Sequence, residues 1–551
     1  MNTIFWNKHN EFRVIWFYIP LVLVHGIISN LHTPILEVVW DSVFYKSLAF
    51  GLHNISSFDL NKHFPVPPFY PFLISVGFFA PDYLTVELIQ SWINPAIYFL
   101  GLFPMYAYSR RMLKPSDAVF VCLLYAIYPS AAYAQWTMSE NLAAPLLIWS
   151  ALSVSRILTD RKPRTLDGAY LGMAIAGLIL TRIFLIVYCA VALGWVVYRT
   201  VKRERDPAPP LMAFGLAFCI AVTAWWQLGY FTREGTQLLY ASFNNDALPS
   251  SISLFATIFS AHWTGLWLEG GLLITGFMIV QWLVAWLLPD KLTRTSREIT
   301  YFAFITTIAL TITVAAYYVK RMGIEPWSIS LRYIFYINLI CLPIFAASLG
   351  ALRKASRKEQ VLRIGALIII IPLLAASLFI PEAWSKLSNN HAFLANAPSL
   401  DFIYQMRNMG ALTASKYLIG ASLIGSIICL FYKRTGMVIS VVIILFIQLS
   451  AIDFIMQTRT TAIETYLANE IHDFCREVEQ KKWGDALIYC EEDGVQLLSN
   501  MNYWLNHPAG TIKVSGDLPH APFMLLTVHE HESDELVFES GELKAYLYEK
   551  H

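Results

Sequence analysis

Residues 168–198 read GAYLGMAIAGLILTRIFLIVYCAVALGWVVY, and the one charge in this apolar run, Arg182, decides how the chain folds. The run holds 31 residues, whereas one helix needs about 20 apolar residues to cross a bilayer. It is therefore either one tilted helix or two short helices that form a hairpin at Arg182.

Basic residues on both sides of the run separate these alternatives. They are Arg161, Lys162 and Arg164 before it, and Arg199, Lys202, Arg203 and Arg205 after it. Cytoplasmic loops are the ones enriched in Lys and Arg, and only a hairpin returns both ends of the run to one side. We therefore predict a hairpin.

The hairpin sets the predicted topology of the whole chain. Other candidate spans lie near 12–31, 88–109, 117–133, 140–157, 210–229, 270–288, 299–319, 333–351, 362–381, 411–432 and 436–456. With the hairpin, the later basic clusters at 291–297, 353–363 and 433–434 also fall on the cytoplasmic side. The first span has no small-residue cleavage site after it, so we expect it to stay as an anchor. The prediction is about thirteen crossings, with the N-terminus cytoplasmic and the C-terminus outside.

Composition agrees with a polytopic α-helical membrane protein. Of 551 residues, 56% are hydrophobic and only 14% are charged, against about 25% charged in a soluble domain. The net charge of +1 gives no reason to expect a nucleic-acid partner. We expect a multi-pass protein of the cell inner (plasma) membrane with the lipid bilayer as its surroundings.

The predicted topology gives short cytoplasmic loops and long outer ones. We divide the chain into a transmembrane module, residues 1–456, with a first outer loop at 32–87, and a soluble non-cytoplasmic domain at 457–551. The domain combines a helical pattern at 461–480 with strand-like runs at 486–490, 511–514, 523–528 and 535–538. We therefore expect a small α/β domain on the periplasmic or extracellular side.

Seven cysteines show no metal-ligand spacing, and five of them lie in apolar segments. Cys475 and Cys490 lie in polar sequence. In an oxidising compartment these two could form a disulfide, and two free thiols in a core are the alternative.

The first outer loop carries the most informative residues. Residues 36–51 read LEVVWDSVFYKSLAFG and residues 67–71 read PPFYP. Asp41 and Tyr45 are four residues apart, so they share one face of a helix. The apolar run 69–80 is too short to span, so we predict an amphipathic or re-entrant helix along the membrane surface. The alternative to a functional role for Asp41 is that it is a solvated carboxylate in a loop.

These features resemble the GT-C glycosyltransferases, in particular the protein O-mannosyltransferases and the bacterial lipid A aminoarabinose transferases. The resemblance rests on an acid soon after the first span, a Tyr four residues later and the PPFYP element. Further matching elements are Arg110-Arg111, Ser139-Glu140-Asn141-Leu142, Gly177 to Arg182, and Leu331-Arg332-Tyr333. It covers about residues 10–350.

The resemblance implies a transferase that moves a sugar from a polyprenyl-phosphate donor to an acceptor outside the cytoplasm, with inversion. Asp41 matches the loop acid proposed as the base of that family. Many relatives carry two adjacent acids there, whereas this chain has Asp41-Ser42. One carboxylate suffices as a general base. The lone Asp favours no metal, although outer-loop carboxylates suit a hard divalent cation. Besides a metal ion, the only small molecule that the resemblance implies is the lipid-linked sugar, as donor substrate.

A leaving lipid phosphate needs cationic stabilisation, and the outer-face cations are the candidates. They are Arg332, Arg182, Lys320 and Arg321. Arginine forks match phosphate geometry. Lys320 and Arg321 are equally explained as side chains that reach the headgroups or balance acids. Arg332 and Arg182 are the stronger candidates, because charges at a membrane edge are costly and usually functional.

Further substrate-site candidates are Tyr45, Tyr70, Glu140 and His262. Glu140 begins a span, where it either caps the helix dipole or touches the site. His262, with Trp263 and Trp267, either lines a sugar-binding surface or belongs to an interfacial aromatic belt.

Glu37 is the rival base, and Asp59 and His63 are weaker loop candidates.

We weigh two alternatives to this transferase. A polyprenyl-lipid or solute transporter (flippase) also needs many helices and intramembrane charge, but no internal repeat is evident. An O-antigen-ligase-like transferase would use a diphosphate donor. The chain has no P-loop and no Gly-x-Gly-x-x-Gly after a strand, so a nucleotide-driven process is not expected. The acceptor is a protein, a lipid or a glycan.

Overall fold

The computed structural model describes residues 8–30, 40–53, 66–80, 83–160, 162–202, 206–227, 252–322, 335–351, 356–377 and 420–428, with shorter segments from 432 to 548. Two compact units emerge. The first combines Met1–His25, Asn94–Gln135 and Ser139–Ile455, and the second combines Gly26–Ile93, Trp136–Met138 and Met456–His551. The predicted division into a transmembrane module (1–456) and a soluble domain (457–551) stays a prediction.

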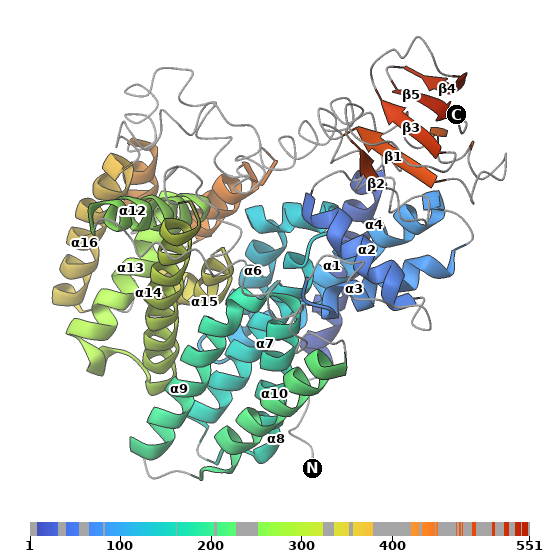
Figure 1. Cartoon of the computed structure of the whole chain (residues 1–551). Coiled ribbons are helices and arrows are strands. Elements are labelled where there is room, and N and C mark those ends of the chain that lie inside the picture. The colour runs from blue at the N-terminus through green and yellow to red at the C-terminus, as the bar shows by residue number, and fades with distance from the viewer. Residues whose placement is uncertain are drawn as a thin grey trace. The chain divides into compact units, whose positions relative to one another are not determined.

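Helices dominate the first 377 residues (Figure 1). In chain order they are α1 (Lys8–Asn30), α2 (Trp40–His53), α3 (Phe69–Ile74), η3 (Ser75–Phe79), α4 (Tyr83–Phe99), α5 (Leu102–Ser109), α6 (Pro115–Ala126), η4 (Pro129–Gln135), α7 (Glu140–Thr159), α8 (Thr165–Thr181), η5 (Ile183–Leu185), α9 (Ile186–Lys202), α10 (Ala208–Gln227), α12 (Ile252–Glu269), α13 (Leu272–Leu287), η6 (Pro289–Lys291), α14 (Arg294–Met322), α15 (Tyr336–Ala351) and α16 (Arg357–Ser377).

Every predicted span overlaps a helix of the structure. For the last two predicted spans, the described helical residues are 420–428 and 434–446. Within the described residues, three helices are long and apolar enough to cross a membrane, or four if the bent pair α6 and η4 is one span. Seven shorter apolar helices accompany them. The count of thirteen crossings and the orientation of the termini stay predictions.

The surface of the helical bundle is apolar. Large side chains such as Trp16, Phe214 and Ile369 are more than half exposed. Water does not tolerate an apolar surface of this extent on a soluble monomer, whereas lipid chains do. The structure therefore supports the membrane protein that composition predicts.

The predicted hairpin at Arg182 is present. Arg182 has an extended backbone (φ −149°, ψ 108°) between α8 and η5. The Cys189 thiol lies 3.9 Å from the Ile175 carbonyl oxygen, and these residues are equally far from Arg182 along the chain. In one continuous helix they would be about 21 Å apart. The chain therefore folds back at Arg182, and both α8 and α9 pack against α7.

Close packing of α8 against α10 involves two glycines. A Cβ atom at Gly168 would collide with the Pro209 carbonyl, and one at Gly172 would lie 2.7 Å from the Ala213 oxygen and 2.9 Å from Leu216 Cβ. Small residues four apart on a helix allow two backbones to approach closely in a membrane. This contact explains why glycines occupy positions 168 and 172 in the N-terminal half of α8.

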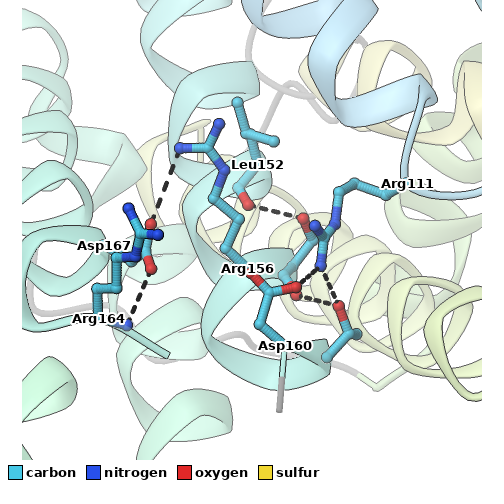
Figure 2. A network of polar contacts seen from close by, with 8 residues as sticks. Arg111, Leu152, Arg156, Asp160, Arg164 and Asp167 are labelled. Carbon is cyan, nitrogen blue, oxygen red and sulfur yellow. Dashed lines mark hydrogen bonds and ion pairs between the residues drawn. The ribbon is translucent and has the colours of Figure 1, made fainter. Parts of the chain in front are cut away.

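Ion pairs join helix ends around the turn between α7 and α8 (Figure 2). Arg156, in the last turn of α7, lies 3.8 Å from Asp167, in the first turn of α8, and Asp167 also accepts from the Arg164 backbone N–H at 3.1 Å. Arg111 donates to Asp160 and, at 2.5 Å, to Thr159 Oγ1. A base in a last turn and an acid in a first turn both suit the helix dipoles.

Among the described C-terminal residues, five strands form a mixed sheet, red in Figure 1, of order β2-β1-β3-β5-β4. Its strands are β1 (Leu487–Glu491), β2 (Gly510–Ile512), β3 (Phe523–Thr527), β4 (Glu535–Ser540) and β5 (Leu543–Tyr548). β1 runs parallel to β2 and β3, and β5 pairs antiparallel with β3 and β4. The four predicted strands are confirmed, and β5 is an addition. In the predicted helix 461–480, the described residues 470, 473, 474 and 477 are helical.

The predicted surface helix of the first outer loop is present as α3 followed by η3. Phe72, Val76 and Phe79 are exposed on it, at the spacing of one helix face. On the other side, Tyr70 and Ile74 are fully buried. Both of these faces carry apolar side chains, so the segment is not amphipathic, and its place at a membrane surface stays a prediction.

Candidate functional site

The first unit contains a buried polar group made of Glu140, Arg182 and Tyr336. Glu140 is the first residue of α7, Arg182 lies at the hairpin tip, and Tyr336 is the first residue of α15. The Arg182 guanidinium forms an ion pair with the Glu140 carboxylate. Its Nη1 also donates to the Tyr336 hydroxyl at 3.3 Å. Two of the predicted site residues, Glu140 and Arg182, therefore lie together.

Local structure explains why these charges occur in a buried place. Glu140 is fully buried and Arg182 nearly so. An isolated ion there would be expensive, whereas an ion pair with further hydrogen bonds offsets part of the desolvation. The N-terminus of α7 adds a partial positive charge that favours the carboxylate. Ser139, the N-cap residue, also donates from its hydroxyl to Glu140 Oε2 at 3.4 Å.

Aromatic rings form one wall of this group. Phe335 lies 4.1 Å from the Tyr336 ring and 5.5 Å from the Tyr133 ring, measured between centroids. Tyr133 lies in η4, whose seven residues are all buried. Tyr336 was not among the predicted site residues. The signal for it was its position four residues after Arg332 in the sequence.

The second unit holds the candidate base on α2. Asp41 is the second residue of α2, and its side chain lies outside the described part of the chain. Tyr45 and Tyr70, both predicted, are brought together: both are buried and their rings meet edge to face at 5.4 Å. Lys46, the residue after Tyr45, was not among the predicted site residues. It forms a buried ion pair with Glu87 of α4.

His262 is fully buried in α12. It adjoins a series of aromatic rings that continues from α12 into α13, in which Trp263 contacts Trp267 at 5.1 Å and Trp267 contacts Trp282 at 5.5 Å. The predicted aromatic surface beside His262 is therefore largely a packed core. A role for His262 in binding sugar stays a prediction.

Several predicted residues fall outside the described part of the chain. They are Arg332, Glu37, Asp59, His63 and Cys475, together with the side chains of Lys320 and Arg321 in the last turn of α14. Cys490 lies in β1, and its disulfide with Cys475 stays a prediction. Among the described residues, no group of three or more His, Cys, Asp or Glu side chains is placed to hold a metal ion.

The comparisons with known proteins identify the fold. A scan against protein-family models and a search of curated proteins gave no match. Two solved structures are similar over 97% of this chain and 97% of theirs. One is ArnT from Cupriavidus metallidurans bound to undecaprenyl phosphate, with a TM-score of 0.60 at 14% identity. The other is the same protein in the apo state, with a TM-score of 0.57 at 16% identity. The chain therefore has the fold of ArnT.

Proposed function

We propose that this protein is a membrane glycosyltransferase that moves a sugar from a polyprenyl-phosphate donor to an acceptor on the outer face of the inner membrane, with inversion. The observation that carries the proposal is the likeness of fold, over nearly the whole of both chains, to ArnT with undecaprenyl phosphate bound. The order of motifs along residues 10–350 supports it independently, because that order depends on the sequence alone.

The proposed reaction is a single displacement. The Asp41 carboxylate accepts the proton of an acceptor hydroxyl while the hydroxyl oxygen attacks the anomeric carbon of the donor sugar. The bond between that carbon and the phosphate oxygen breaks, and its electron pair stays on the oxygen. The products are the glycosylated acceptor, polyprenyl phosphate and a protonated Asp41. Attack opposite to the leaving group inverts the anomeric centre.

The phosphate side of the proposed site is assigned to Arg182, with Lys320, Arg321 and Arg332 as further cations. A guanidinium has five N–H donors in a planar fork. Arg182 can therefore keep its contacts with Glu140 and Tyr336 while it donates to a phosphate oxygen. In this assignment Glu140 orients Arg182, and Tyr336 limits the rotation of the guanidinium.

The test is sugar transfer by purified full-length protein in detergent, with a labelled polyprenyl-phosphate sugar as donor. We expect Asp41→Asn to lower kcat by about 100-fold or more. Asp206→Asn is the control, because Asp206 is exposed beside α10, where it accepts a hydrogen bond from the Ala208 backbone N–H. Unchanged transfer by folded Asp41→Asn protein would exclude Asp41 as the base, and loss in Glu37→Gln instead would move the role to Glu37.

The same preparation separates a transferase from a transporter. Wild-type protein in liposomes that moves intact lipid-linked sugar across the bilayer, and never glycosylates an added hydroxyl acceptor, would refute the proposed function in favour of the transporter.

A further inference from the structure

The Lys46–Glu87 ion pair is unusual for its depth and geometry. Lys46 Nζ lies 2.5 Å from one oxygen of the Glu87 carboxylate and 2.6 Å from the other. The exposed fractions of the two side chains are 1% and 7%. Two charges are withdrawn from water only at a large desolvation penalty, and well-packed apolar residues of similar volume often stabilise a protein as well as a buried pair does.

The position of Lys46 on α2 gives the pair a geometric effect. Successive residues of a helix turn by 100°, so Tyr45 lies roughly 40° around the axis from Asp41, and Lys46 roughly 140°. Tyr45 packs against Tyr70 in the first of these directions. Lys46 is held by Glu87 in the second, which is about 100° further around the axis. Two contacts in different directions hold a helix against rotation about its axis better than one contact does.

The partner of Lys46 belongs to a surface of α4 that contacts both α2 and the α3–η3 segment. Three residues after Glu87, Gln90 donates to the Ile74 carbonyl of α3 at 3.2 Å. A Cβ atom at Gly77 of η3 would lie 3.1 Å from Gln90 Cγ. Further along α2, Phe50 meets Phe78 edge to face at 5.3 Å. One face of α4 therefore fixes both α2 and the α3–η3 segment.

From these contacts we infer that the Lys46–Glu87 pair is a positioning element for the proposed reaction: it sets the rotation of α2 and thereby the direction in which residue 41 faces. Neither residue touches substrate in this assignment. The inference rests on the proposed function, in which Asp41 is the base. A directed salt bridge suits this role better than an apolar contact, because its short distances define one orientation.

The test compares Glu87→Gln and Lys46→Met with the conservative variants Glu87→Asp and Lys46→Arg in the transfer assay. Displacement of a catalytic group by 1 Å costs about 100-fold in rate, so we expect the first two variants to lose roughly 10-fold to 100-fold in kcat. Their KM for the lipid-linked donor should stay within about twofold, because binding is not disturbed. The conservative variants should regain most of the loss.

The matched control is Glu298→Gln, which neutralises another buried carboxylate. Arg199 of α9 donates from Nε to Glu298 of α14 at 2.8 Å, and Glu298 is fully buried. Because that pair is remote from α2 in the chain and belongs to the first unit, Glu298→Gln should lower thermal stability as Glu87→Gln does while kcat stays within about twofold. Equal loss of kcat in both variants would mean that Glu87 acts only through stability and would overturn the inference.

A second measurement does not depend on sugar transfer by the protein. Hydrogen exchange of full-length protein should be faster in peptides covering 40–53 in Glu87→Gln, and unchanged in them in Glu298→Gln. If wild-type protein transfers sugar and the Lys46 and Glu87 variants keep its kcat, the inference fails and the proposed function stands. If wild-type protein transfers nothing, the proposed function fails, and the exchange of 40–53 alone decides whether the pair holds α2.

Discussion

A single methyl group at Gly168 is expected to destabilise the packing of α8 against α10. In Gly168→Ala, the new Cβ atom collides with the Pro209 carbonyl of α10, which is backbone and cannot rotate away. The same substitution at Gly194 of α9 meets nothing within 4 Å. The two variants therefore differ in packing and share the same gain in helix propensity.

The expected magnitudes follow from these contacts. Alanine is more favourable than glycine in a helix by about 1 kcal/mol. Overpacking a tight contact destabilises by about 1–3 kcal/mol, with the high end where backbone must move. We expect Gly168→Ala to lower the free energy of unfolding by about 2 kcal/mol net, and Gly194→Ala to raise it by about 0.5–1 kcal/mol.

Unfolding in detergent with increasing SDS, followed by tryptophan fluorescence, measures both changes. Gly172→Ala should fall on the destabilised side as well, because its Cβ atom would lie 2.7 Å from the Ala213 oxygen. A Gly168→Ala protein as stable as Gly194→Ala would refute the close approach of α8 and α10. Equal destabilisation of both variants would show that glycine is needed for flexibility rather than for packing.

Three further predictions concern other parts of the chain. Arg363→Met should destabilise the protein by about 3–5 kcal/mol, because buried Arg363 donates to Glu359 and Gln281, and exposed Arg357→Met should change stability by less than about 0.5 kcal/mol in the same SDS titration. Gly541→Val should make the C-terminal sheet more sensitive to limited proteolysis, because Gly541 has a φ of 56° that a β-branched residue does not adopt. Tyr336→Phe should lower kcat/KM in the transfer assay by roughly 10-fold or more, since it removes a hydrogen bond to a charged group.

The features predicted correctly from the sequence are those with a local signal. The break at Arg182 follows from one charge in an apolar run and from the basic residues that flank it. The strands β1 to β4 follow from short β-like runs between polar turns. β5 was missed although Leu543, Ala545 and Leu547 alternate with larger or polar residues, because the hairpin turn at Gly541 was not recognised as joining two strands.

The features that could not be predicted depend on pairs of residues distant in the sequence. Glu140 and Arg182 were each candidates on separate grounds, but nothing in the chain indicates that they bond across 42 positions. Lys46 carries no signal of its own in the sequence, because its partner Glu87 lies 41 positions later in the chain. Likewise, the need for glycine at positions 168 and 172 of α8 follows only from the α10 backbone that packs against them.

The charge of Glu140 limits what Arg182 can contribute to the proposed reaction. A polyprenyl-phosphate sugar is a phosphodiester with one negative charge, whereas the released polyprenyl phosphate is a monoester with about −1.5 to −2 at pH 7. The site must therefore offset up to one additional negative charge as the bond breaks. The Arg182–Glu140 pair is neutral as a whole, so it can donate hydrogen bonds to the phosphate but cannot match that change. If the proposed function holds, further positive charge has to come from elsewhere, and Lys320, Arg321 and Arg332 are the predicted source. Neutralising these three residues should consequently reduce kcat more than it weakens binding of the donor. The additional negative charge that they offset develops on the phosphate only as the donor bond breaks.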